Sequence, residues 1–202
     1  MEFKKLDINK HNLNKVSRLI YETELGHVQP LFGKNQEKAQ KNIKKLIYAG
    51  KNSFGHDKIH VVAGENEDVL GILVSYSGNE INASDEIKAF LKAMGIIEFL
   101  KLALIGLILY KLLAADIKHD DYYLSNISVD KTHRSKGIGS FILEKSFELA
   151  REKSASRVIL DVSLDNERAL RLYERFGFRV HDKKSIKWFG EEIGMFNMEK
   201  IL

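Results

Sequence analysis

Residues 123–139 read YLSNISVDKTHRSKGIG, and this stretch decides the fold. Its first half is a mainly apolar run with β-branched residues, which predicts a strand over Tyr122–Val129. Its second half is a turn with two glycines, Gly137 and Gly139, and a helix-forming segment follows. The sequence therefore predicts a strand, a glycine turn and a helix in direct succession.

The glycine turn has the properties of a phosphate-binding turn. Gly137 and Gly139 allow unusual backbone angles and a close approach of a ligand to the main chain. The first N–H groups of the following helix lack intrahelical acceptors, and they bind anions with the help of the helix dipole. Arg134 and Lys136 add positive charge. The dinucleotide and Walker A motifs do not match, since Ile142 stands where the former requires its third glycine.

A second strand and helix follow. Arg157–Ser163 is almost entirely apolar, as expected for a strand covered on both faces. Asn166 comes next, and a helical stripe is formed by Ala169, Leu172, Tyr173 and Phe176. This i, i+3, i+4, i+7 spacing places the Tyr173 phenol on the core face, so plain packing is an alternative to a chemical role.

The remaining patterns complete an α/β order. Phe3–Ile8 predicts a first strand, two amphipathic helices follow, and Lys58–Ala63 with Val69–Tyr76 predicts an antiparallel hairpin. The last two strands are expected from Phe178 onward and over Met195–Ile201. We expect one domain over 1–202, with a mixed, mostly antiparallel sheet of six or seven strands flanked by helices.

Composition narrows the functional classes. The 202 residues carry 32 basic and 28 acidic side chains, a net charge of +4, and the basic run Lys183-Lys184 is too short for a nucleic-acid surface. The absence of cysteine excludes disulfides, thiolate metal sites and a cysteinyl acyl-enzyme. The seven histidines form no convincing metal set, so no metal is expected. The N-terminus lacks a signal-peptide core, which predicts a cytoplasmic protein.

An apolar insertion interrupts the sheet between the third and fourth strands, at about residues 84–116. Its centre, Ala93–Ala115, is helix-like but includes Glu98, Lys101 and Lys111, which disfavour a transmembrane helix. Four alternatives stay open: a helix buried in this protein, a homodimer contact, a lid over the substrate, and a contact with a membrane surface.

These motifs resemble the GNAT superfamily of acyl-CoA-dependent N-acetyltransferases. The family's Arg/Gln-x-x-Gly-x-Gly/Ala pattern is matched by Arg134 to Gly139, and its second half by Asn166, Ala169, Leu172-Tyr173 and Gly177-Phe178. The strong part covers about sixty residues, and the long insertion departs from the family pattern. The resemblance implies a GNAT-like fold and an acetyl group transferred from acetyl-CoA to a primary amine by direct attack.

The resemblance also implies roles for individual residues. Main-chain groups of Ile127 and Val129 are expected to pair with the pantetheine arm, with Ser128 in the same cofactor site, and the Ile127 amide is expected to polarise the thioester carbonyl. The diphosphate is held by Arg134, Ser135, Lys136, Gly137, Ile138, Gly139 and Ser140. Asn166 contacts the pantetheine near the sulfur, and Tyr173 protonates the departing thiolate. A phenol with a pKa of about 10 is independently a competent acid for this step.

The acceptor side is less specified. Glu22 and Glu24 follow the first helix, and Tyr76 and Asn126 lie at strand positions that can face an acceptor amine. None of them stands out as the general base. The acceptor itself stays open between a small molecule and a protein N-terminus or lysine. Two other hypotheses remain: a non-catalytic acyl-CoA-binding module that signals or associates through the insertion, and a membrane-surface acyltransferase.

Overall fold

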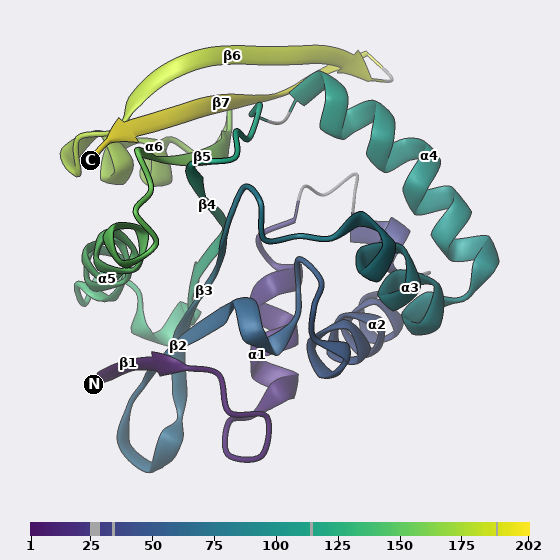
Figure 1. The fold of residues 1–202 in the computed structure, drawn as a ribbon, viewed down its shortest axis with the longest axis horizontal. Coiled ribbons are helices and arrows are strands. Elements are labelled where there is room, and N and C mark those ends of the chain that lie inside the picture. Colours follow the sequence, from purple (N-terminus) through teal and green to yellow (C-terminus); the bar gives the residue numbers. More distant parts are fainter. Residues whose placement is uncertain (25–28, 34, 114, 189) are drawn as a thin grey trace.

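The computed structural model describes residues 1–24, 29–33, 35–113, 115–188 and 190–202. Seven strands form one sheet in the order β1-β2-β3-β4-β5-β7-β6 (Figure 1). Only β4 and β5 run parallel, and all other neighbours are antiparallel. The predicted mixed, mostly antiparallel sheet is therefore confirmed. The strands are β1 Glu2–Lys5, β2 Ile59–Ala63, β3 Val69–Ser77, β4 Asp121–Val129, β5 Arg157–Ser163, β6 Arg179–Trp188 and β7 Glu191–Ile201.

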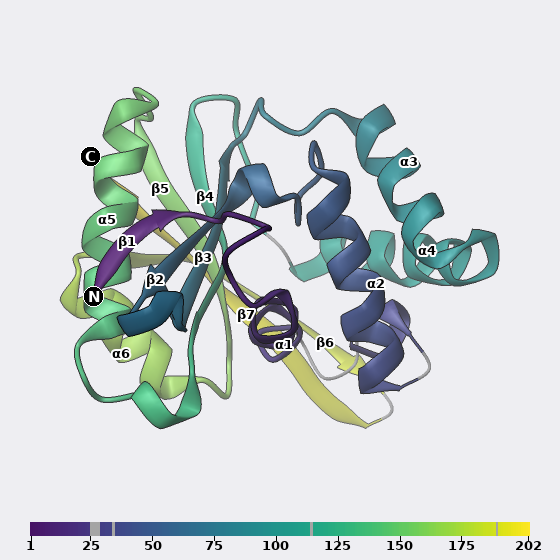
Figure 2. The ribbon, with the colours of Figure 1, turned by 90° about the horizontal axis from the view of Figure 1, so that it is seen from below.

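Helices cover both faces of the sheet (Figures 1 and 2). One face carries α1 Leu13–Tyr21 and α2 Gln36–Ala49, and the other carries α5 Ile138–Glu152 and α6 Glu167–Arg175. Side chains of the central strands alternate between two cores, so Ile72 and Val74 belong to the α1–α2 core while Leu73 belongs to the α5–α6 core. The short 3-10 helices are Gln29–Phe32, His56–Lys58, Glu65–Glu67 and Lys131–His133.

Asparagine begins four of the helices. The side-chain oxygens of Asn12, Asn35, Asn82 and Asn166 accept hydrogen bonds from main-chain N–H groups of the first turns of α1, α2, α3 and α6. These N–H groups lack intrahelical acceptors, and an asparagine oxygen satisfies them better than most side chains. The caps thus locate the starts of helices that periodicity alone leaves uncertain by a few residues.

The insertion, expected to be helical over about residues 84–116, folds as two helices, α3 Ala83–Met94 and α4 Ile96–Leu113. Residue 114 lies outside the described residues. Gly95 separates the helices with a φ of +86°, a left-handed conformation that ends α3. None of the helices in the described ranges is both long and apolar enough to cross a bilayer.

Strand β4 contains a β-bulge beside the place where it separates from β5. Val74 pairs with Asn126 but Ser75 pairs with Leu124, so Ser125 is an extra residue in β4. On its other side, β4 pairs with β5 only from Asp121 to Tyr123. Beyond Tyr123 the two parallel strands separate, and the gap is lined by side chains from both faces of the sheet.

Candidate active site

A cleft of about 540 Å³ occupies the separation of β4 and β5. Its walls are the second half of β4, the end of β5, the turn that begins α5, the first part of α6 and the C-terminal end of α1. The glycine turn and Tyr173 line it from the α5–α6 side, whereas Glu22 and Thr23 line it from the α1 side. The cleft therefore passes through the sheet and joins the two sides.

Main-chain donors line two parts of this cleft. The Asp130 amide donates to the Leu70 carbonyl at 2.9 Å, on the β3 side of β4. Since successive amides of a strand point to opposite edges, those of Ile127 and Val129 point to the β5 side, where β4 has no strand partner. At the start of α5 the first intrahelical bond joins the Phe141 amide to the Gly137 carbonyl at 3.0 Å. The amides of Ile138, Gly139 and Ser140 precede it.

The glycine turn depends on left-handed backbone at two positions. Gly137 has a φ of +81° and Ser135 a φ of +64°. A Cβ added to Gly137 would meet nothing within 4 Å, so the space above it is open on the cleft side. Three arginines, Arg134, Arg168 and Arg175, also line the cleft. An anionic ligand is thus complementary to this part of the site.

The predicted cofactor residues mostly line the cleft together. Those in the lining are Ile127, Ser128, Val129, Arg134, Ser135, Gly137, Ile138, Gly139, Ser140 and Asn166, whereas Lys136 is exposed outside it. Arg134 donates through Nε to the Val129 carbonyl at 3.1 Å. Asn166 lines the cleft while its oxygen caps α6 by accepting from the Ala169 amide at 3.2 Å.

Tyr173 lines the cleft from α6 and is otherwise buried against Phe178, whose ring centroid lies 5.8 Å away. Burial raises the pKa of Tyr173 to about 12. The phenol is therefore neutral across the physiological range and carries a proton that it can donate.

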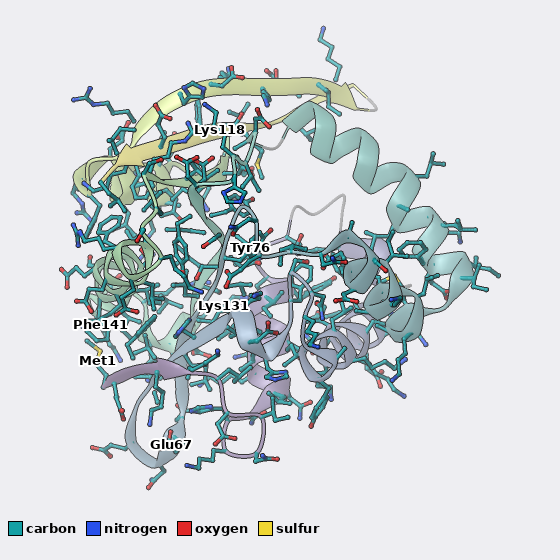
Figure 3. The ribbon with its side chains drawn as sticks, in the orientation of Figure 1. Met1, Glu67, Tyr76, Lys118, Lys131 and Phe141 are labelled. Atoms are coloured by element: carbon teal, nitrogen blue, oxygen red, sulfur yellow. The ribbon has the colours of Figure 1, made fainter. Side chains whose placement is uncertain are left out.

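The predicted acceptor residues divide into two groups. Glu22 and Asn126 line the cleft, and Glu22 lies 3.5 Å from the Lys131 ammonium, which is labelled in Figure 3. Tyr76, also labelled there, is not part of the lining and packs edge-on against Tyr123 with centroids 5.6 Å apart. Glu24 is half-buried and is not among the lining residues, which it contacts through Asn126, and residues 25–28 of its loop lie outside the described residues.

Asn126 joins this loop to β4. Its amide nitrogen donates to Thr23 Oγ1 at 2.7 Å and to Glu24 Oε1 at 3.0 Å, while Ser125 Oγ donates to its oxygen at 2.9 Å. Burial raises the pKa of Glu24 to about 7, against the lowering effect of the Asn126 hydrogen bond. A carboxylate with this pKa, held beside the cleft wall, is suited to take up a proton near neutral pH.

Sequence reasoning missed several cleft residues. Arg168 of α6 lines the cleft and donates to Ser135 Oγ at 3.1 Å, and its place two residues after Asn166 was the available signal. Asp161 of β5 also lines the cleft. Its carboxylate accepts hydrogen bonds from Tyr123 Oη at 3.0 Å, from the side-chain amide of Asn197 at 2.6 Å and from the main-chain amide of Ala115 at 3.1 Å. Burial raises the pKa of Asp161 despite these donors. These partners come from three other segments of the chain, so no local pattern indicates them.

Asp130 fastens the glycine turn to α1. Its carboxylate accepts from the Thr132 amide and hydroxyl at 3.0 and 2.6 Å, and it pairs with Arg18 at 2.7 Å. The Thr132 hydroxyl in particular, with the Thr132 amide and the Lys15 and Arg18 charges, holds the pKa of Asp130 well below its usual range. The strand end and the start of the turn are thereby held in one position.

We expect Asp130→Ala to lower the free energy of unfolding by about 2 kcal/mol at pH 7, because a charged cap and its ion pairs are lost. A carboxylate with a depressed folded pKa stabilises fully above the unfolded pKa of about 3.9, and the contribution fades as the pH falls below it. Urea unfolding should therefore show a gap between wild type and variant that narrows from about pH 5 to 3. Asp85→Ala, at a half-exposed carboxylate 3.8 Å from Lys88, is the control and should change stability little. If the difference in unfolding free energy between wild type and Asp130→Ala is the same at about pH 5 and pH 3, the depressed pKa of Asp130 does not contribute to stability.

Among the described residues, no group of three histidine, aspartate or glutamate side chains is arranged to hold a metal ion.

The fold and the separation of β4 from β5 are of the GNAT type. Residues 32–178 match the model of the Acetyltransferase (GNAT) family, so the chain belongs to that family.

Relatives and solved structures agree with this membership. The chain is 34% identical over 67 residues to N-alpha-acetyltransferase 30 of Xenopus laevis, a match that covers 33% of this chain and 24% of the relative. It is 34% identical over 62 residues to glucosamine 6-phosphate N-acetyltransferase of Trypanosoma brucei brucei, covering 31% and 40%. These matches thus span less than half of either relative. A solved N-acetyltransferase of Staphylococcus aureus Mu50 has the same fold, with a TM-score of 0.67 at 22% identity over 99% of this chain and 100% of that one.

Proposed function

We propose that the chain transfers the acetyl group of acetyl-CoA to a primary amine by direct attack. The observation that carries this proposal is the cleft itself. One opening between β4 and β5 is lined by the glycine turn, by the unpaired edge of β4 and by Tyr173. A diphosphate, an extended amide-bearing arm and a thioester require these three features in this order.

The residues present fit coenzyme A. The amides of Ile138, Gly139 and Ser140 and the cations Arg134 and Arg168 would hold the diphosphate. The amides of Ile127 and Val129 would bind the pantetheine arm as an added strand, and the Ile127 amide would stabilise the oxyanion. Acetyl-CoA supplies an activated thioester. The open space above Gly137 is where a phosphate oxygen would approach the main chain.

Glu24 is our candidate for the general base. An amine with a pKa of about 10.4 is protonated at neutral pH, and it must lose its proton before it attacks. Glu24 has a pKa raised to about 7, and its carboxylate accepts a hydrogen bond from Asn126, which lines the cleft. Asp161 has a raised pKa too, but it accepts from three donors that stabilise its charged form. Because Glu24 is not among the lining residues, a water molecule would carry the proton to it.

Acid and base would then act from opposite faces of the sheet. Tyr173 belongs to α6 on one face, whereas Glu24 follows α1 on the other. The ammonium first passes one proton through water to Glu24, which releases it to solvent. The neutral nitrogen then forms its bond to the acetyl carbon, and its second proton leaves by the same route on the α1 side. The carbon–sulfur bond breaks, the thiolate accepts the Tyr173 proton, and Tyr173 regains a proton from solvent. The chain has no cysteine to form an acyl-enzyme, which supports direct attack.

The acceptor is proposed as an α-amino group of a peptide or a small primary amine. One relative is named as an N-alpha-acetyltransferase, and another is named for glucosamine 6-phosphate. Glu22 at the cleft and Glu24 beside Asn126 are acidic groups on the side from which an amine would enter.

Release of free thiol from acetyl-CoA, measured against a panel of peptides, amino sugars and polyamines, tests the function. We expect at least one amine to raise the rate well above background. Tyr173→Phe should then lower kcat by about 10- to 100-fold, since a thiol with a pKa near 8.5 leaves fairly well even without an acid. Coenzyme A should bind the variant as before. Binding of coenzyme A by the wild type with no turnover on any amine would favour a non-catalytic binding module.

A further inference from the structure

The insertion exposes an unusually apolar strip of helix. Ile96, Ile97, Leu100 and Leu104 are 69%, 68%, 59% and 66% exposed, and they lie on one side of α4. Phe99 and Leu102, on the other side of the helix, pack against the α1–α2 core. We call the four exposed residues the insertion face. It differs from scattered exposed hydrophobics because its members recur at helical spacing over more than two turns.

Two exposed lysines belong to the same pair of helices as the insertion face. Lys92 of α3 and Lys101 of α4 are exposed, and neither forms an ion pair with another described residue. The acidic residues described on these helices are less available. Asp85 lies 3.8 Å from Lys88, Glu86 accepts from the Ser53 amide at 2.8 Å, and Glu98 is half-buried. An apolar helix face bordered by lysines has the composition of helices that lie in the interface of an anionic membrane.

We propose that the insertion face docks onto an anionic lipid surface, with its four aliphatic side chains among the acyl chains and the lysines at the headgroups. The lysine side chains are long enough to keep their ammonium groups at headgroup level while α4 lies in the interface plane. No span of the bilayer is involved.

A second copy of the chain fits this face less well. The strip from Ile96 to Leu104 is about 14 Å long and about 10 Å wide, whereas a stable interface buries roughly 800 Å² on each partner. Pairing the strip with itself would also bring Lys101 close to the same residue of the other copy. Charge complementarity therefore favours the lipid surface.

The insertion face and the cleft are separate in space. In Figures 1 and 2, α4 lies on the opposite side of the molecule from α5 and α6. None of the described cleft-lining residues belongs to α3 or α4. Docking through α4 would therefore leave the cleft open, and substitutions on the insertion face should not alter ligand binding there.

Flotation with lipid vesicles tests the proposal on the full chain. We expect the protein to float with phosphatidylcholine vesicles that contain phosphatidylglycerol, to bind phosphatidylcholine alone much more weakly, and to be released by salt. The double variant Leu100→Glu/Leu104→Glu should lower the partition coefficient at least tenfold. Lys92→Glu/Lys101→Glu should lower it at least tenfold on anionic vesicles only, since each lysine contributes roughly a fivefold factor near such a surface.

Circular dichroism and coenzyme A binding serve as controls, and both should be unchanged in the two double variants. Val180→Glu, at a residue of β6 that is 44% exposed, controls for the loss of one surface hydrophobic and should still float. Equal binding to both vesicle types, or none, overturns the proposal. The proposal is also overturned if the wild type does not bind vesicles but forms a dimer in light scattering, and Leu100→Glu/Leu104→Glu converts this dimer to a monomer. These outcomes do not depend on whether the chain acetylates an amine.

Discussion

Gly137→Val should weaken the binding of coenzyme A by at least 100-fold in calorimetry. Gly137 has a φ of +81°, and a β-branched residue there costs about 1–3 kcal/mol of backbone strain. If the turn rearranges to relieve the strain, the amides of α5 are no longer aimed at one point. If it does not rearrange, the valine side chain occupies the open space above the turn. Each charge-assisted hydrogen bond lost contributes about 1.5–3 kcal/mol, so the loss of two accounts for the expected effect.

Gly190→Val is the matched control for this substitution. Gly190 has a φ of +89°, and a Cβ added to it would also meet nothing within 4 Å. It lies between β6 and β7 and is not among the described residues that line the cleft. We expect it to show a similar loss of stability with unchanged coenzyme A affinity. Gly137→Val with wild-type affinity would remove the glycine turn from the binding site.

Glu24→Gln should lower kcat by about 100-fold and flatten its pH dependence. In the wild type, kcat at saturating amine should rise with pH through about 7, because the base acts only when it is ionised and the pKa of Glu24 is raised to that value. Tyr173 stays protonated to about pH 12 and should add no alkaline limb in the working range. The variant keeps the shape of the side chain and the Asn126 contact but has no proton acceptor.

Glu22→Gln is the control that shows whether the effect of Glu24→Gln comes from that particular carboxylate or from the loss of any negative charge near the cleft. Glu22 lines the cleft and lies 3.5 Å from Lys131. In Glu22→Gln, kcat should still rise with pH through about 7, as it does in the wild type. In Glu24→Asp, kcat should also rise with pH near 7 but reach a lower maximum, because the shorter side chain places the carboxylate farther from the amine. If Glu24→Gln keeps the wild-type profile, the proton goes to another group, and Asp161 is the next candidate.

Local patterns were sufficient for much of the fold. The apolar run Arg157–Ser163 predicted β5, and the two hydrophobic runs around residues 64–68 predicted the hairpin of β2 and β3. Gly137 marked the turn before α5, because its φ of +81° is one that few other residues adopt. The apolar centre Ala93–Ala115 contains α4, and the polar part before it forms the separate helix α3, because Gly95 adopts a left-handed conformation between the two.

The amino-acid sequence by itself determined the order of elements, the glycine turn and the stripe that carries Tyr173, because each depends on residues a few positions apart. Only the tertiary structure decided how β4 and β5 separate, and which face of the sheet each polar group approaches. The raised pKa of Glu24 arises from burial of its own carboxyl beside Asn126, which is 102 residues away in the sequence. Asp161 accepts hydrogen bonds from Tyr123, Asn197 and Ala115, which come from three other segments. Burial and long-range hydrogen bonds are properties of the packed chain, so no local pattern contains them.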